Sequence, residues 1–164
     1  MSVVDRLAAA GIDLPRPAVP IASYVPWVRC GDLLHLSGQL PFRPDGSLIS
    51  GKCGHDLSVQ QGSEAARACA IMLLAQINMA IGTLETIDRI VKLGVYVNSS
   101  AEFLDHPKVA NGASDLFEEI FGERGRHCRS AVGVTALPLG VAVEVDAIIA
   151  LKADGMRDRQ GFDQ

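Results

Sequence analysis

The stretch from Arg129 to Leu151 constrains the fold more than any other part of the chain. Its second half alternates with a period of two, which is the pattern of a β-strand with two distinct faces. Residues 137–140 interrupt the alternation with a proline and a glycine, which favour a connection over a continuing strand. We therefore predict two strands. One face of the second strand carries Val141, Val143, Val145, Ala147, Ile149 and Leu151, and the other carries Ala142, Glu144, Asp146, Ile148 and Ala150.

We expect these two strands to pair as a hairpin about Pro138. In that register Arg129 lies near Asp146. Ala131, which is small and leaves space beside the arginine, lies near Glu144 on the same face. A guanidinium fork can hold a small anion while a neighbouring carboxylate positions a water molecule or a proton. The same arrangement is also that of an ordinary cross-strand ion pair, which contributes little to stability.

Length and charge exclude several classes of protein. At 164 residues the chain is long enough for one domain with a substantial core. Its net charge of −4 gives no basic surface for nucleic acid. The four cysteines have no paired spacing, so we predict reduced thiols and no metal site. We find no signal peptide, and the apolar segment 65–81 is broken by polar residues, which indicates a buried helix. We therefore expect a cytoplasmic protein with no membrane partner.

The rest of the chain supplies further elements in a definite order. An N-terminal segment of residues 1–20 begins with a short amphipathic helix, through Val4, Leu7, Ala8 and Ile12, and ends in a connector with three prolines. Residues 153–164 form a polar tail. Between them we predict strands at 24–29 and 33–37, a helix from Asp56 or Ser58 to Ile81, a strand at 90–98, a helix beginning near Pro107, and the two final strands.

The order ββαβαββ over residues 21–152 predicts an α+β fold, with two helices on one face of a mixed sheet. The apolar face of the last strand then meets the helices. Its second face, on which the two carboxylates sit between small and aliphatic residues, would be left uncovered. An uncovered sheet face of this composition favours an assembly of several copies.

The C-terminal pattern resembles a signature of the Rid family, the YjgF-type reactive intermediate deaminases that are also labelled endoribonuclease L-PSP. The pattern is an arginine followed by serine, an alternating strand, Leu-Pro, and a strand with an acid before a second apolar run. The resemblance covers roughly residues 21–151 and includes Tyr24 and the segment Ser37-Gly38-Gln39. It implies a chorismate-mutase-like ββαβαββ fold, which is assembled as a homotrimer with clefts between the subunits.

The resemblance also implies an activity, the hydrolysis of reactive enamines and imines such as 2-aminoacrylate and 2-iminopropanoate to 2-keto acids and ammonia. Arg129 matches the family's carboxylate-binding arginine, and Glu144 matches the acid that holds the attacking water. Tyr24, Ser37 and Asn111 match residues that line the substrate cleft. No cofactor is implied, because the substrate is already activated. Asp146 remains an alternative to Glu144, as its structural partner or in its role.

The sequence also departs from the family pattern near the arginine. Familiar deaminases read Pro-Ala-Arg where this chain has His127-Cys128-Arg129, and many carry a cysteine where this chain has Ala131. A Cys–His nucleophile is a weak hypothesis here, because adjacent residues tend to point apart. The departures leave a second function open, a non-catalytic trimer that binds small carboxylates or 2-keto acids. Retention of both Arg129 and Glu144 favours the enzyme, because binding alone needs only the arginine. A ribonuclease ranks third, since the chain lacks a basic patch.

Overall fold

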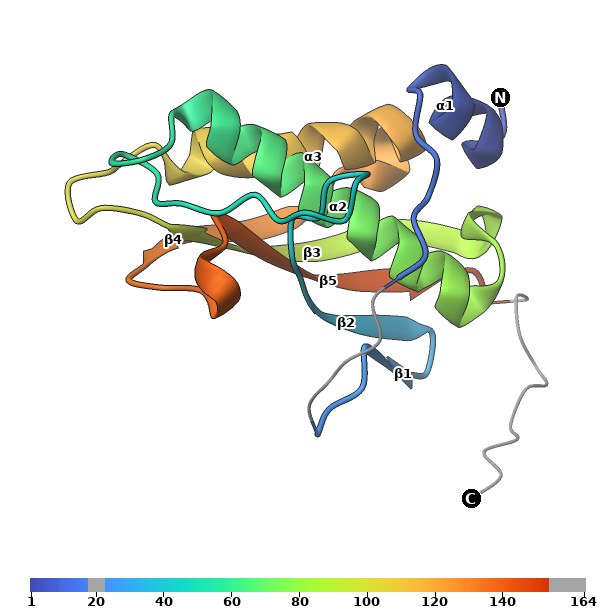
Figure 1. The fold of residues 1–164 in the computed structure, drawn as a ribbon. Helices are drawn as coiled ribbons and strands as arrows, with labels where there is room; N and C mark the ends of the chain where they lie inside the picture. The colour runs from blue at the N-terminus through green and yellow to red at the C-terminus, as the bar shows by residue number, and fades with distance from the viewer. Residues whose placement is uncertain (18–22, 154–164) are drawn as a thin grey trace.

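The computed structural model describes residues 1–17 and 23–153, and it consists of a five-stranded mixed sheet with two long helices on one face (Figure 1). A third, short helix lies at the N-terminus. The chorismate-mutase-like α+β order expected from the sequence is confirmed. The elements are α1 (Val3–Ala9), β1 (Trp27–Cys30), β2 (Leu33–Gln39), α2 (Val59–Ile81), β3 (Ile87–Asn98), α3 (His106–Phe121), β4 (Cys128–Val134) and β5 (Val143–Leu151).

The strand order in the sheet is β1-β2-β5-β3-β4, so the expected hairpin of β4 with β5 is wrong. β3 lies between them and pairs with β5 antiparallel and with β4 parallel. The physical reason is that α3 forms the crossover from β3 to a parallel β4, and β5 then takes the place between β2 and β3. Arg129 therefore lies opposite Leu93 and not near Asp146, and Ala131 lies opposite Val95 and not near Glu144.

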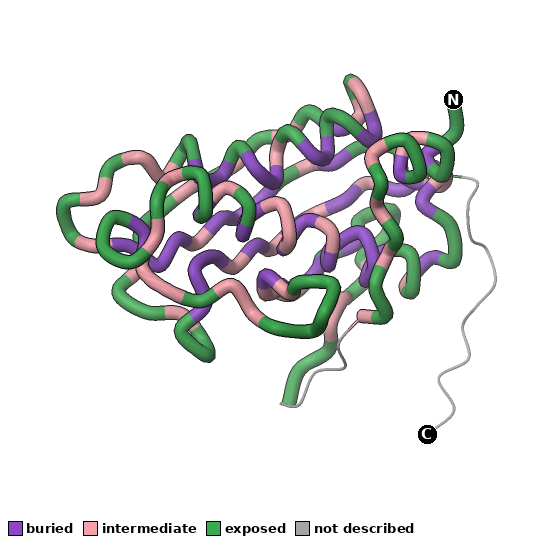
Figure 2. Tube along the Cα trace, turned by 45° about the horizontal axis from the view of Figure 1, so that its top comes forward, coloured by how far each residue is buried: buried purple, intermediate pink, exposed green. Residues whose placement is uncertain are grey.

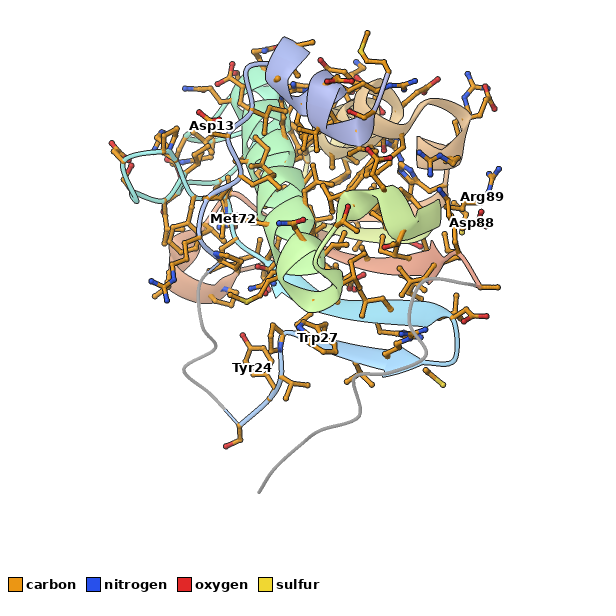
Figure 3. The ribbon with its side chains drawn as sticks, turned by 90° about the vertical axis from the view of Figure 1, so that its right-hand side faces the viewer. Asp13, Tyr24, Trp27, Met72, Asp88 and Arg89 are labelled. Carbon is orange, nitrogen blue, oxygen red and sulfur yellow. The ribbon has the colours of Figure 1, made fainter. Side chains whose placement is uncertain are left out.

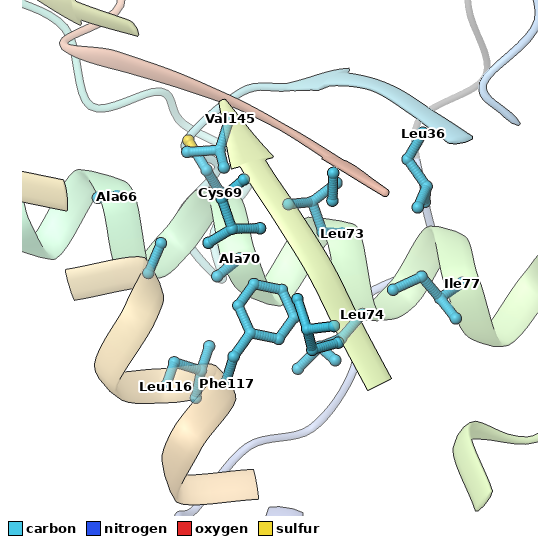
Figure 4. Packing of buried hydrophobic residues seen from close by; sticks show 14 of the residues in the cluster. Leu36, Ala66, Cys69, Ala70, Leu73, Leu74, Ile77, Leu116, Phe117 and Val145 are labelled. Atoms are coloured by element: carbon cyan, nitrogen blue, oxygen red, sulfur yellow. The ribbon is translucent and has the colours of Figure 1, made fainter. Parts of the chain in front are cut away.

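The alternation of β5 is confirmed, since residues 143, 145, 147, 149 and 151 are buried while those between them are only partly covered. Figure 2 shows the buried positions concentrated between the sheet and the helices. In that core Cys69 and Leu73 of α2 pack with Phe117 of α3 and Val145 of β5 (Figure 4). Alternate burial thus gives the sheet one face under the helices and one open face.

α2 is the central helix of this core. It begins with a capping box, in which the Ser58 hydroxyl accepts from the Gln61 N–H and the Gln61 side chain accepts from the Ser58 N–H. Gly82 ends it with a φ of 78°, which a glycine adopts without strain. By length and composition alone α2 could cross a membrane, but it packs against β5 and α3. It is a core helix.

The N-terminal segment differs in detail from the expectation. In α1 it is Val3 and Leu7 that are buried, while Val4 is 66% exposed, so the apolar face begins one residue earlier than predicted. The Val3 N–H donates to the Glu85 carboxylate at 2.6 Å and fixes α1 to the body of the domain. β1 begins at Trp27 and not at residue 24, because Pro26 has no N–H to donate to a strand ladder. The end of the connector (18–20) and the tail (154–164) lie outside the described residues.

Candidate functional site

Arg129 lies on β4 and points toward α3, on the helix side of the sheet. Its Nη1 donates to the Ser114 hydroxyl at 2.9 Å and its Nη2 to the Pro107 carbonyl at 3.0 Å. Asn111 is exposed, and it lies four residues after Pro107 and three before Ser114, which puts it on the same stripe of α3. A guanidinium carries five N–H donors, so these two bonds leave donors with which Arg129 can hold an anion.

A cavity of about 340 Å³ opens beside Arg129. Sequence reasoning missed two of the α3 residues around it, Ser114 and Glu118. Their spacing of four puts them on one helix face, but only the pairing of β4 beside β3 shows that this face turns toward Arg129. The cavity is lined by Ser114, Glu118, Gly125, Arg126, His127 and Arg129.

His127 contacts two of these groups. Its Nδ1 lies 2.6 Å from the Gly125 carbonyl and its Nε2 3.0 Å from the Ser114 hydroxyl. Burial, followed by the nearby charge of Arg129, lowers the pKa of His127, although the Gly125 carbonyl and Glu118 oppose this. The Cys128 thiol donates instead to the Val91 carbonyl at 3.1 Å. The structure therefore gives no support to a Cys–His nucleophile.

Glu144 lies on the opposite face of the sheet from Arg129. It pairs with Tyr96 across the strands, and its carboxylate lies over Gly38 of β2, where a Cβ would overlap it. The side chain is half-buried and accepts no hydrogen bond from the described residues. Burial first, and then the charge of Asp146, raises the pKa of Glu144. A carboxyl with a raised pKa and free oxygen atoms is suited to exchanging protons with a water molecule.

Asp146, in contrast, is held by the protein itself. It accepts the Gly94 N–H and the Tyr96 hydroxyl, each at 3.1 Å. The carboxylate of Asp146, through its charge and this hydrogen bond, raises the pKa of Tyr96. Of the two acids that the sequence left open, Asp146 has the contacts of a structural partner, and Glu144 is the one with free oxygen atoms.

Ser37 and Tyr24 lie near the same end of the sheet as Glu144. Ser37 sits in a bulge of β2 next to Gly38, and its hydroxyl donates to the Val25 carbonyl at 2.8 Å. Tyr24 is 55% exposed and lies just before β1, near Trp27 (Figure 3). The Ser37 hydroxyl is thus engaged in holding the segment that carries Tyr24.

The five residues expected to form one site therefore fall into two groups. We call Arg129 with Asn111 the Arg129 half-site, and Glu144 with Ser37 and Tyr24 the Glu144 half-site. The first lies on the edge strand β4 and on α3. In the second, Glu144 lies on the central strand β5, Ser37 on β2, and Tyr24 just before β1. Arg129 and Glu144 also lie on opposite faces of the sheet. Leu93 of β3 pairs with Arg129 on one side and with Ala147 on the other, so Arg129 shares the face of buried Ala147. Glu144 is three residues from Ala147 along β5, and an odd spacing in a strand puts it on the other face. One copy of the chain does not bring the two half-sites together.

Other kinds of site are not formed by the part of the chain that the structure describes. Among residues 1–17 and 23–153, no three His, Cys, Asp or Glu side chains gather as metal ligands. The four cysteines, all within these ranges, are free thiols, with Cys30 and Cys128 exposed and Cys53 and Cys69 buried. Burial raises the pKa of the Cys69 thiol well above its usual value, as expected for a core cysteine.

Comparison with known proteins agrees with the fold and the sequence pattern. Residues 4–150 match the family described as "YjgF/chorismate mutase-like, putative endoribonuclease". The chain is 49% identical over 150 residues to protein TCP17 of Trypanosoma cruzi, which covers 91% of this chain and 94% of that protein. It is also similar to the crystal structure of Atu1372 from Agrobacterium tumefaciens, a protein of unknown function, with 41% identity and a TM-score of 0.84 over 92% of this chain and 94% of that one.

A more distant relative has a crystal structure with a bound ligand. Escherichia coli TdcF with bound serine is 26% identical to this chain, with a TM-score of 0.60 over 82% of this chain and 93% of TdcF. The family match covers most of the domain, and the order of strands and helices is the one that the sequence pattern implies. The chain therefore belongs to the YjgF/chorismate-mutase-like family, the Rid family of proteins.

Proposed function

We propose that this protein is a hydrolytic deaminase of small reactive 2-imino acids, of the 2-aminoacrylate/2-iminopropanoate type. Water adds to the imine carbon, the imine nitrogen takes up a proton, and the resulting carbinolamine loses ammonia to leave a 2-keto acid. The carbon is already electrophilic, so the protein has to orient the carboxylate of the substrate and to move protons. In this proposal Arg129 orients the carboxylate and Glu144 moves the protons.

Arg129 supports the proposal through its remaining donors. Ser114 and Pro107 fix two of its N–H groups against α3, which holds the guanidinium in one orientation before a ligand arrives. A held guanidinium binds a carboxylate through two parallel hydrogen bonds. Asn111, exposed on the same stripe of α3, is within the half-site and offers an amide to the substrate.

Glu144 supports the hydrolytic step. Its raised pKa and its free oxygen atoms are the properties of a group that takes a proton from water and returns it to a leaving amine. Tyr24 and Ser37 would line the pocket from the same half-site, and Ser37 would act by holding the Tyr24 segment in place.

The separation of the half-sites is the observation that carries the proposal of a homotrimer with shared sites. The Arg129 half-site, at the edge strand β4, must then meet a different surface, the Glu144 half-site, on the next copy. Such a contact is heterologous, and heterologous contacts form a ring when the rotation between copies closes. The open sheet face also exposes apolar side chains that an assembly would cover, among them Val28 (54%), Leu33 (38%) and Val132 (45%). In the ring, Arg129 of one copy would face Glu144 of the next.

A second function, the non-catalytic binding of small carboxylates, has one observation in its favour. TdcF was crystallised with bound serine, a small carboxylate, and the arginine alone is enough to hold such a ligand. We do not propose ribonuclease activity, because the chain carries a net charge of −4. The four free thiols favour a reducing compartment, and we assign the protein to the cytoplasm.

The test is the decay of freshly generated 2-iminopropanoate in the presence of the wild type, Arg129→Ala and Glu144→Gln. Arg126→Ala is the matched control, since Arg126 lines the same cavity but pairs with Glu118 at 3.0 Å. We expect the wild type and the control to accelerate decay, and each site variant to lose roughly 100-fold or more. A wild type no faster than buffer that still binds pyruvate through Arg129 would establish the binding function instead.

A further inference from the structure

A chain of three hydrogen bonds connects the guanidinium of Arg129 to the backbone near Gly125. The directions of these bonds follow from the groups involved. The Gly125 carbonyl can only accept, so Nδ1 of His127 carries the proton and, in the neutral ring, Nε2 accepts. The Ser114 hydroxyl then donates to Nε2 and accepts from Nη1 of Arg129. The bonds measure 2.6, 3.0 and 2.9 Å.

We propose that Ser114 and His127 form a relay that positions Arg129, and that His127 takes up a proton when Arg129 captures a small carboxylate. The inference rests on the proposed function, because it concerns the ligand of the same arginine. Ser114 and His127 are positioning residues in this relay. Familiar deaminases carry proline where this chain has His127, and a proline has no ring nitrogen that titrates in this position.

The charges around His127 favour its neutral form in the free protein. The imidazole of His127 lines the cavity together with three charged residues. These are Glu118 of α3 and, from the segment that contains His127, Arg126 and Arg129. Arg126 is largely neutralised by Glu118 and Glu123, at 3.0 and 3.4 Å. Arg129 has no carboxylate partner among the described residues, and its charge helps to keep the partly buried imidazole neutral.

A bound carboxylate changes this balance. It offsets the charge of Arg129, so the imidazolium form of His127 is less disfavoured in the complex than in the free protein. When protonated, Nε2 of His127 donates to Ser114, whose own proton turns elsewhere while the hydroxyl still accepts from Arg129. Because the complex holds the proton more tightly, affinity is higher at low pH and falls as pH rises through the titration of His127.

The relay is tested by calorimetric titration of the full-length protein with pyruvate, in two buffers of different ionisation enthalpy, at about pH 6, where a histidine titrates. The variants are His127→Gln, whose amide oxygen can still accept from Ser114 but does not titrate, and Ser114→Ala. His55→Gln is the control, because His55 is exposed and its Nδ1 hydrogen-bonds to Asp56 at 2.6 Å, away from the cavity. We expect proton uptake in the wild type and the control and none in His127→Gln.

Two further results are expected from the same variants. The wild-type affinity for pyruvate should fall about tenfold between mildly acidic and mildly alkaline pH, while that of His127→Gln stays flat. Ser114→Ala should weaken binding at every pH, because Arg129 loses the hydroxyl that holds it. A wild type that binds pyruvate without proton uptake refutes the relay alone. Uptake that persists in His127→Gln also refutes it.

A measurement without ligand separates the relay from the proposed function. Nitrogen-15 NMR of the free protein should find neutral His127 protonated at Nδ1, and the midpoint of its titration should rise in Arg129→Leu, since a neighbouring cation is removed. A proton on Nε2 in the neutral ring would overturn the relay whatever the protein binds. A wild type that binds no pyruvate while showing the expected tautomer would refute the proposed function and the binding of a carboxylate by Arg129, but not the hydrogen-bonded arrangement of Ser114 and His127.

Discussion

Gly38→Ala tests the role of Glu144 without removing it. A Cβ on Gly38 would overlap a carboxylate oxygen of Glu144 and lie 2.7 Å from its carboxyl carbon, so the carboxyl group must move by roughly 1 Å to reach van der Waals contact. The obstacle is the far end of a flexible side chain, which can turn aside. A misplacement of about 1 Å costs a catalytic group roughly 100-fold in rate, and we expect that loss in kcat for imine hydrolysis.

The stability of Gly38→Ala should change little. Alanine restricts the unfolded chain and contributes about 0.4–1 kcal/mol, while forcing Glu144 from its rotamer costs about 0.5–1.5 kcal/mol. The two effects nearly cancel, so urea unfolding should show a free energy within about 1 kcal/mol of the wild type. Loss of activity with retained stability would identify a displaced catalytic group.

Gly94→Ala is the matched comparison, because Gly94 lies under Asp146 as Gly38 lies under Glu144. Its Cβ would come within 2.6 Å of an Asp146 oxygen and break the bonds that hold that carboxylate. We expect a loss of about 1–2 kcal/mol in stability, typical of a charge-assisted hydrogen bond with some solvent access, and little change in kcat. An active Gly38→Ala would refute our assignment of Glu144, and an inactive, stable Gly94→Ala would transfer the role to Asp146.

Three further predictions concern stability. Gly112→Ala should destabilise the fold by about 1–2 kcal/mol in urea titration, although alanine favours helices, because the new Cβ would lie 2.7 Å from the backbone carbonyl carbon of Ser63; equal or higher stability would contradict this helix packing. Ser58→Ala should lose about 1 kcal/mol, since the Gln61 N–H loses its cap, and Ser58→Asp should retain it. Glu144→Gln should raise the urea midpoint at neutral pH but not at about pH 4, because the raised pKa makes ionisation of Glu144 unfavourable in the folded state.

The sequence predicted those parts of the fold that depend on local pattern. The period of two in β5 identified its buried face, Gly82 identified the end of α2, and the start of α2 was narrowed to Asp56 or Ser58, of which Ser58 is the cap. The strand order was not predictable in the same way, because periodicity says which face of a strand is buried and not which strand lies beside it. The expected hairpin followed from nearness in sequence, and the insertion of β3 between β4 and β5 overturned it.

The same limit applied to the candidate site. Arg129 and Glu144 were identified by type and by family resemblance, but their expected proximity depended on the wrong strand pairing. Ser114 and His127 were not predicted as partners of Arg129, because their contacts join a helix to a strand across the fold. Pro26 gave a local signal against a strand at Tyr24, since it removes a donor just where the ladder would begin.

Arg129 lies on an edge strand and Glu144 on the opposite face of the central strand, and this separation has a consequence for assemblies that mix two variants. In the proposed ring of three, each site takes its arginine from one copy and its glutamate from the next. Arg129→Ala and Glu144→Gln, each inactive alone, would therefore complement one another in mixed trimers, because every mixed ring contains one junction with both intact groups. Co-expression in equal amounts should restore about one quarter of wild-type activity, whereas a site built within a single copy would restore none.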